Sequence, residues 1–235
     1  MKFASLFLQE GIPPVIVSLK DKIPLKAIRT MEKQGVRFVE LRVDLYASWD
    51  PEHVLKEAGR FARFSSIATI RSRAEGGRWN LSERERLGLF TALLPKVDAV
   101  DIELSSRAIV TQVIREARRR RKRVLVSYHD FRRTPSLEKL NQIAREAKSL
   151  GADIVKVAAR ASAFKDVQTL ARFALENVSK NVITLAMGSK GLVSRLLFPA
   201  LGSLAVYACL DEPLAPGQPD YRSMFRLLRW IYPGG

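Results

Sequence analysis

Residues that build disulfide frameworks and metal centres are scarce in this sequence of 235 residues. It contains one cysteine, Cys209, and two histidines, His53 and His129. A single cysteine excludes a disulfide framework and any multi-cysteine metal site, and two histidines leave little scope for a histidine-based metal centre. The sequence therefore predicts no metal site. We expect Cys209 to be a small buried residue and His53 a surface residue, neither with a functional role.

Long apolar runs are missing as well. Charged residues or proline interrupt every apolar run before the roughly 18 residues that a membrane-spanning helix needs. Residues 1–10 lack the pattern of a signal peptide, in which a charged segment precedes a long apolar core and a small-residue cleavage site. We therefore expect no membrane partner and a cytoplasmic location.

Low-complexity segments and Gly/Ser linkers are also lacking, so nothing marks a domain boundary. Apolar residues make up 47% of the chain, which is enough for a sizeable core at this length. The sequence therefore predicts one domain covering residues 1–235.

The charge is strongly one-sided, with 40 basic and 24 acidic residues and a formal net charge of +16. Such a surplus can indicate binding to nucleic acid or to an anionic membrane. Its densest part is the run at residues 115–123, which has no aromatic side chains interleaved for base stacking. Cations there would also favour the C-terminal end of a helix. We therefore interpret the run as a solvated helix end and expect no nucleic-acid partner.

Short segments rich in valine and isoleucine alternate with segments of helical pattern. The expected strands cover residues 14–19, 36–43, 66–70, 99–104, 123–128, 153–158, 181–186 and 203–208. The expected helices cover residues 23–34, 51–61, 82–94, 106–121, 136–150, 163–177, 190–201 and 220–231. Capping residues support several of these boundaries, among them Asp50 before Pro51, Ser82, and Gly151.

Strands joined through helices pair in parallel, because each crossover needs about a dozen residues. Eight such units favour a (β/α)8 TIM barrel. The alternative is a doubly wound open sheet, which would more often place a glycine-rich phosphate loop after the first strand. Residues 18–21, Ser-Leu-Lys-Asp, do not form such a loop.

Polar residues occupy one face of several expected strands. Side chains alternate with a period of two, and the face beneath the helices must be apolar. Lys156 is the only charge within residues 154–158, and an unpaired ammonium beneath helices would be very costly. It is therefore expected to point into the barrel. The same sorting sends eight ionisable groups inward: Glu40, Arg42, Asp44, Arg71, Asp101, Glu103, His129 and Lys156.

The inward set favours Schiff-base chemistry. Burial and neighbouring positive charge would both favour the neutral amine of Lys156, which is the nucleophile that attacks a carbonyl. His129 would suit proton transfer near neutral pH. The residues thus predict a Schiff-base lyase or aldolase. A core lysine paired with Asp101 or Glu103 is the structural alternative.

Six segments together resemble the type I 3-dehydroquinate dehydratases. They are Glu-Leu-Arg-Val-Asp at 40–44, Thr-Ile-Arg at 69–71 leading to Glu-Gly-Gly at 75–77, Ser-Tyr-His-Asp-Phe at 127–131, Val-Lys at 155–156, Ala-Met-Gly at 186–188 with Ser-Arg at 194–195, and Ala-Pro-Gly-Gln at 215–218. They occur in the family's order and cover nearly the whole chain, from about residue 14 to residue 218.

The resemblance implies a (β/α)8 barrel that converts 3-dehydroquinate to 3-dehydroshikimate in the shikimate pathway of aromatic amino acid biosynthesis, without cofactor or metal. Lys156 would condense with the ring ketone. His129 would remove the adjacent proton and then protonate the departing hydroxyl, and Glu75 would orient His129. Relatives are commonly homodimers, and the helix near residues 224–231 could supply an interface.

The remaining roles that the resemblance implies concern substrate binding. Arg195 would bind the substrate carboxylate, a task suited to a guanidinium group. Gln218 would lie in a loop that closes over the substrate. The other expected substrate-binding residues are Ser18 on the floor, Glu40, Arg42 and Arg71 at ring hydroxyls, and Met187 beside the ring and the imine.

Two positions depart from the family pattern. Leu214 stands where many members carry a serine, and Tyr128 stands where others often have a smaller polar residue. A class I aldolase or transaldolase would share the barrel and the lysine. The segment at 127–131 and Arg195 argue against that alternative.

Overall fold

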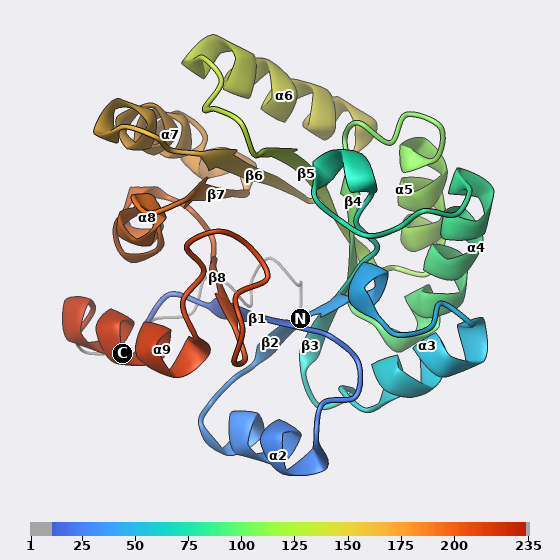
Figure 1. Ribbon diagram of the computed structural model, residues 1–235. Helices are drawn as coiled ribbons and strands as arrows, with labels where there is room; N and C mark the ends of the chain where they lie inside the picture. Colours follow the sequence, from blue (N-terminus) through green and yellow to red (C-terminus); the bar gives the residue numbers. More distant parts are fainter. Residues whose placement is uncertain (1–10, 234–235) are drawn as a thin grey trace.

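Eight parallel strands form the centre of the computed structural model, which describes residues 11–233 (Figure 1). The strands are β1 (Val15–Leu19), β2 (Phe38–Arg42), β3 (Ser65–Thr69), β4 (Ala99–Glu103), β5 (Arg123–Asp130), β6 (Ile154–Arg160), β7 (Val182–Met187) and β8 (Val206–Cys209). Each pairs with its neighbour in the chain from β1 to β7, and β8 pairs with β1. Between β7 and β8 the link is an isolated parallel bridge from Val182 to Ser203. The strands therefore form a nearly closed barrel.

Helices surround the strands on the outside (Figure 1). They are α2 (Leu25–Lys33), α3 (Pro51–Gly59), α4 (Glu83–Leu93), α5 (Val110–Arg119), α6 (Leu137–Leu150), α7 (Phe164–Glu176), α8 (Gly191–Leu197) and α9 (Tyr221–Ile231). Short 3-10 helices lie at Val43–Leu45, Arg73–Glu75, Leu94–Lys96, Val178–Lys180 and Phe198–Leu201. The predicted (β/α)8 TIM barrel is confirmed, and the open doubly wound sheet is wrong. The prediction of one domain over residues 1–235 extends beyond the described residues, as does the interpretation of residues 1–10.

Alternation along the strands separates two apolar cores. On β7, Ile183, Leu185 and Met187 face the barrel interior, while Val182 and Ala186 pack beneath the helices. The interior core continues around the barrel through Ile16, Phe38, Ile67, Ala99, Leu125, Ile154, Ala158, Ala205 and Tyr207. The interior is thus apolar at the amino ends of the strands. Polar groups face inward nearer the carboxyl ends, which is where sites lie in this fold.

Capping explains most helix boundaries. Ser82 caps α4 in a full capping box with Glu85, and the side chains of Asp50 and Ser136 cap α3 and α6. Two expected helices are shorter than predicted. The helix expected at 106–121 covers only Val110–Arg119, after a turn at residues 107–109. The helix expected at 190–201 becomes a 3-10 helix from Phe198 onward, with Pro199 in its first turn.

The basic run lies at the opposite end of the barrel from the polar interior. It covers the C-terminal end of α5 and the first residue of β5, as expected. Arg119 and Arg120 pair with Glu116, and Arg123 pairs with Asp153 just before β6. No helix within residues 11–233 is long and apolar enough to cross a membrane.

Candidate active site

One cavity at the carboxyl ends of the strands is lined by all ten residues to which the family resemblance gave a catalytic or substrate-binding role. They are Ser18, Glu40, Arg42, Arg71, Glu75, His129, Lys156, Met187, Arg195 and Gln218. Seven further residues complete the lining: Gly76, Phe131, Ala158, Leu185, Tyr207, Leu214 and Ala215. Residues separated by up to 200 positions in the chain therefore meet at one place, because each strand ends at the same face of the barrel.

Lys156 is the buried cation at the centre of this site. Its Nζ lies 3.0 Å from Asp101 Oδ2 and 3.4 Å from Glu40 Oε1. Arg42 and Arg71 line the same cavity, as expected, but the ion-pair partners of Nζ are carboxylates. The pairing with Asp101 that the sequence offered as the structural alternative is thus present, and Glu40 rather than Glu103 is the second partner. Burial acts to raise the pKa of Glu40, but the charges of Lys156 and Arg42 outweigh it and lower that pKa. Ser18 and Thr69 also donate hydrogen bonds to Glu40, at 2.7 and 2.9 Å.

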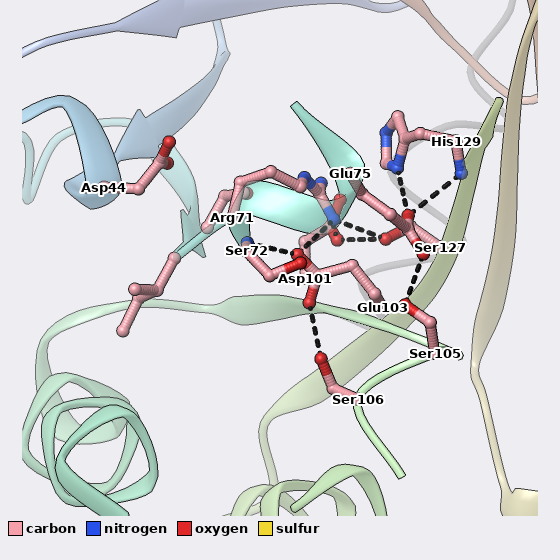
Figure 2. A network of polar contacts seen from close by, with 12 residues as sticks. Asp44, Arg71, Ser72, Glu75, Asp101, Glu103, Ser105, Ser106, Ser127 and His129 are labelled. Atoms are coloured by element: carbon pink, nitrogen blue, oxygen red, sulfur yellow. Dashed lines mark hydrogen bonds and ion pairs between the residues drawn. The ribbon is translucent and has the colours of Figure 1, made fainter. Parts of the chain in front are cut away.

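Arg71 shares Asp101 with the lysine. Figure 2 shows Arg71 among the buried polar side chains of Asp101, Glu103 and Ser127. It donates to Asp101 at 2.9 Å and to Ser127 at 2.7 Å, and it forms an ion pair with Glu103 at 3.3 Å. Burial acts to raise the pKa of Asp101, but Arg71 and Lys156 outweigh it and hold that pKa well below its usual range. Asp101 thus stays ionised beside Lys156 at physiological pH.

His129 and Glu75 form a buried pair at the edge of the cavity (Figure 2). Glu75 Oε2 lies 2.8 Å from Nδ1 of His129 and accepts the backbone N–H of the same residue at 2.9 Å. Ser105 donates to the other oxygen of Glu75. When Glu75 is ionised, Oε2 can only accept, so we assign the ring proton to Nδ1, which leaves Nε2 with a free lone pair.

Burial controls the protonation of this pair. It lowers the pKa of His129 well below 6.5, and the charges of Arg71 and Lys156 lower it further. Burial also raises the pKa of Glu75 to about 7. The imidazole is therefore neutral near pH 7 and can accept a proton. The ring of Phe131 stacks on that of His129 with 6.4 Å between centroids.

Arg42 lines the cavity, but Asp44 does not. Arg42 makes two hydrogen bonds to Asp44, from Nε at 3.0 Å and from the terminal nitrogen at 2.9 Å. The expectation that Asp44 extends the inward face of the strand is wrong, because β2 ends at Arg42 and a 3-10 helix begins at Val43. Asp44 instead holds Arg42 in place from outside the cavity.

Arg195 is a buried guanidinium that pairs with no carboxylate of residues 11–233. It donates to the backbone oxygens of Ala186 and Gly191 at 3.1 and 3.0 Å, and to that of Tyr207 at 3.3 Å. Burial lowers its pKa to about 10, which reflects a charge without an opposite charge nearby. An arginine held in this way at a cavity is suited to bind an anionic group.

The loop after β8 lies within the ring of helices and closes one side of the cavity (Figure 1). Gln218 donates to Ser18 at 3.2 Å and accepts the backbone N–H of Leu214 at 2.9 Å. Gly217 has φ of +74°, and a Cβ there would lie 2.4 Å from the oxygen of Gly188. This close approach requires glycine, so the turn seats the loop against the end of β7.

Sequence reasoning missed two buried residues. Arg86 is fully buried on α4 and donates to Glu103, to Ser106 and to the backbone oxygen of Ile70. Its signal was its spacing: it shares the buried face of the helix with Leu89 and Phe90. Tyr207 also lines the cavity, and alternation along the last strand would have placed it there.

Among the residues that the structure describes, no group of three or more histidine, cysteine, aspartate or glutamate side chains is placed to hold a metal ion. Cys209 is buried, as expected. His53 is partly buried beside Asp21, with 3.1 Å between Nε2 and the carboxylate.

These features define a class of protein: a (β/α)8 barrel with a lysine, a histidine–glutamate pair and an arginine around one cavity at the strand ends. Comparison with known proteins narrows the class. The family model for type I 3-dehydroquinase matches residues 15–234. The chain belongs to the type I 3-dehydroquinase family.

Individual relatives agree with this assignment. The chain is 38% identical to a 3-dehydroquinate dehydratase of Methanosarcina barkeri, covering 96% of this chain and 97% of the relative. It is 34% identical to that of Thermodesulfovibrio yellowstonii, covering 94% and 97%. The crystal structure of the type I enzyme from Clostridium difficile, with covalently modified comenic acid, superposes with a TM-score of 0.87 at 25% identity, covering 95% of this chain and 94% of that one.

Proposed function

We propose that the protein dehydrates 3-dehydroquinate to 3-dehydroshikimate in the shikimate pathway, through a Schiff base on Lys156. The observation that carries the proposal is the meeting of Lys156, the His129–Glu75 pair and the unpaired Arg195 at one cavity. A nucleophilic amine, a neutral base and an anion-binding group are what a keto acid needs for elimination through an imine.

The first stage is imine formation. The neutral amine of Lys156 attacks the ketone carbon with its lone pair, and the carbonyl oxygen leaves as water. The product is an iminium ion whose positive nitrogen withdraws electrons from the adjacent carbon. The ammonium must first lose one proton to water. Asp101 and Glu40, whose pKa values are lowered, accept hydrogen bonds from Nζ and hold it in place rather than take that proton.

The second stage is elimination. Nε2 of His129 removes a proton from the carbon next to the iminium, and the electron pair moves to nitrogen to give an enamine. His129 then donates that proton to the departing hydroxyl, which leaves as water while the iminium forms again. Water hydrolyses the iminium to release the unsaturated ketone and Lys156. One water is used and two are released, so the net change is loss of one water.

Substrate binding follows from the remaining lining residues. Arg195 would bind the carboxylate, because its pKa of about 10 leaves it charged and no carboxylate of the described residues competes for it. Arg42, Arg71, Glu40 and Ser18 would bind hydroxyl groups. Met187 would pack on the ring, and Gln218 would hold the loop closed over it.

Location and assembly are further parts of this proposal. We propose a cytoplasmic homodimer without a nucleic-acid partner. Support for the dimer comes from apolar residues exposed on the adjoining helices α8 and α9, where Trp230 is 80% exposed and Leu197 is 48% exposed. Met224, which the sequence placed in the interface helix, packs inward instead.

The test is direct. Purified protein with 3-dehydroquinate should generate the ultraviolet absorbance of a conjugated product, and borohydride should trap the imine as a mass increase on the peptide containing Lys156. Sugar phosphates, the substrates expected for an aldolase or transaldolase, should give neither cleavage nor labelling. No absorbance and no labelling with 3-dehydroquinate would refute the proposal.

A further inference from the structure

Tyr207 is the neighbour of Lys156 that the proposed chemistry leaves without a task. It lies on β8 opposite Ile16 of β1, so its side chain faces the barrel interior. Its ring centroid is 4.1 Å from Nζ of Lys156, a distance at which a cation is attracted to the face of an aromatic ring. The residue is 4% exposed, so water does not weaken this attraction.

The hydroxyl of Tyr207 does not explain this position. It is buried and has no hydrogen-bond partner among residues 11–233. Burial and the nearby charges of Glu40 and Asp101 raise the pKa of Tyr207 well above 10, so the hydroxyl stays neutral. A buried donor without a partner normally costs stability. The ring, rather than the hydroxyl, is therefore the part of the side chain with a defined contact in the site.

Imine formation changes what the other neighbours of Nζ can do. The ammonium has three N–H donors, and Asp101 and Glu40 accept two of them. After the nitrogen bonds to the substrate carbon and the carbonyl oxygen leaves as water, the iminium has one N–H. At least one of the two carboxylate hydrogen bonds is then lost. Attraction to the ring acts on the charge itself and needs no N–H, so it persists.

We propose that Tyr207 is a positioning residue that holds the reactive nitrogen of Lys156 through its ring face during the iminium stages. This inference rests on the proposed Schiff-base function. It goes beyond that function by assigning the aromatic face as the contact that remains when a carboxylate hydrogen bond is lost. The backbone oxygen of Tyr207 also accepts from Arg195, so the same residue of β8 contacts both the lysine and the arginine.

The experiment separates the ring from the hydroxyl. Tyr207→Leu removes the ring and is expected to lower kcat about tenfold or more, with KM within about threefold, and to slow borohydride trapping of 3-dehydroquinate in parallel. Tyr207→Phe restores the ring and is expected to recover most of that loss. The proposal is overturned if the leucine variant keeps its kcat, or if the phenylalanine variant loses as much as the leucine variant.

A matched control accounts for the cavity that leucine creates. Tyr46 is also a buried tyrosine whose hydroxyl has no partner among the described residues, and it does not line the site. Tyr46→Leu should lower the unfolding temperature without lowering kcat. An equal loss of kcat in both leucine variants would overturn the proposal, because the loss would then follow stability.

Fluorinated side chains test the same idea when the leucine variant does not fold. Phenylalanine, 4-fluorophenylalanine and 3,4,5-trifluorophenylalanine at position 207 have nearly the same shape but a progressively weaker negative ring face. The trapping rate and kcat should fall steadily along this series. A flat series overturns the role of Tyr207, whereas a wild-type protein that traps no imine at all overturns the Schiff-base function as well.

Discussion

Arginine side chains are buried among several partners at the carboxyl end of the barrel and are exposed to solvent at its amino end. At the carboxyl end, the side chain of Arg71 is 4% exposed and contacts Asp101, Ser127 and Glu103. At the amino end, the side chain of Arg119 is 68% exposed and has one ion-pair partner, Glu116, on the same helix. The difference shows that the dense basic run, the most conspicuous feature of the sequence, is a poor guide to the site. Isolated charges on apolar strands are a better one.

Energetics explain the difference. An exposed ion pair gains little because water screens it and two long side chains must be ordered. A buried charge must be paired and hydrogen-bonded, so its geometry is fixed by its neighbours. The residues of the candidate site are therefore held in place before substrate arrives, which is what catalysis through a positioned nucleophile and base requires.

Lys156→Ala should show the largest contrast between the two ends. We expect loss of imine trapping and a fall in kcat of at least about a thousandfold, since no other amine lines the cavity. Circular dichroism should show the fold intact. Lys122→Ala, in the basic run, is the matched control and should keep wild-type activity. Dehydration retained by the Lys156 variant would mean that this lysine is structural.

Arg195→Met should chiefly raise KM. Losing a charge-assisted, two-pronged contact with a carboxylate should raise KM about a hundredfold, with a smaller effect on kcat. The unfolding temperature should also fall, because the backbone oxygens of Ala186, Gly191 and Tyr207 each lose the hydrogen bond that Arg195 donates. Arg119→Met at the other end should leave both kinetic constants unchanged. A normal KM for the Arg195 variant would contradict its assignment to the substrate carboxylate.

Replacing Glu75 by glutamine should change the pH dependence of protein stability in one direction. The same replacement at Glu116, at the other end of the barrel, should change it in the opposite direction. Burial raises the pKa of Glu75 from 4.5 to about 7. Its contribution to the free energy of unfolding is therefore fully present below pH 4.5 and is lost as pH rises through 7. Relative to wild type, the glutamine variant should therefore gain about 3 kcal/mol in free energy of unfolding between pH 4 and pH 8 (order of magnitude).

Glu116→Gln is the control of opposite sign. The hydrogen bond from Arg120 lowers the pKa of Glu116, so its contribution is present above pH 4.5 and is lost in acid. That variant should become slightly less stable relative to wild type as pH rises. Urea unfolding of both variants at several pH values measures the slopes, and equal slopes would contradict the burial of Glu75.

Neutralising the basic run should have the smallest effect. Replacing both Arg119 and Arg120 by glutamine should shift the unfolding temperature by about 1 °C or less, because exposed pairs contribute little. At physiological salt, kcat/KM should stay within about twofold of wild type. A large loss of activity would show that the run contributes to function and would weaken the contrast between the two ends.

Strand periodicity predicted much of the site, because alternation is a local property. Lys156 was recognisable as the one charge within residues 154–158, and His129 followed from the same alternation in β5. Asp44 was misplaced, because nothing local shows that β2 ends at Arg42. Helix starts were also predicted well where a serine or aspartate side chain caps them, and less accurately where no side chain does, as at Val110.

The sequence could offer partners across the barrel only as alternatives, because the distances and angles between strands decide which groups meet. For Lys156 it offered Asp101 or Glu103, and the structure pairs the ammonium with Asp101 and Glu40. Arg86 was missed for the same reason, because its partner Glu103 lies on β4 and not on its own helix, α4.

By itself, the sequence determined the eight-fold alternation of strands and helices, the family resemblance and the strand faces that carry charge. These features depend on secondary-structure propensity and on side-chain periodicity, and both are determined by residues close together in the chain. Only the tertiary structure decided which charges pair, which arginine stays without a carboxylate, and that an aromatic ring from β8 lies against the lysine of β6. Those outcomes depend on the distances between segments far apart in the chain, and closure of the barrel determines these distances.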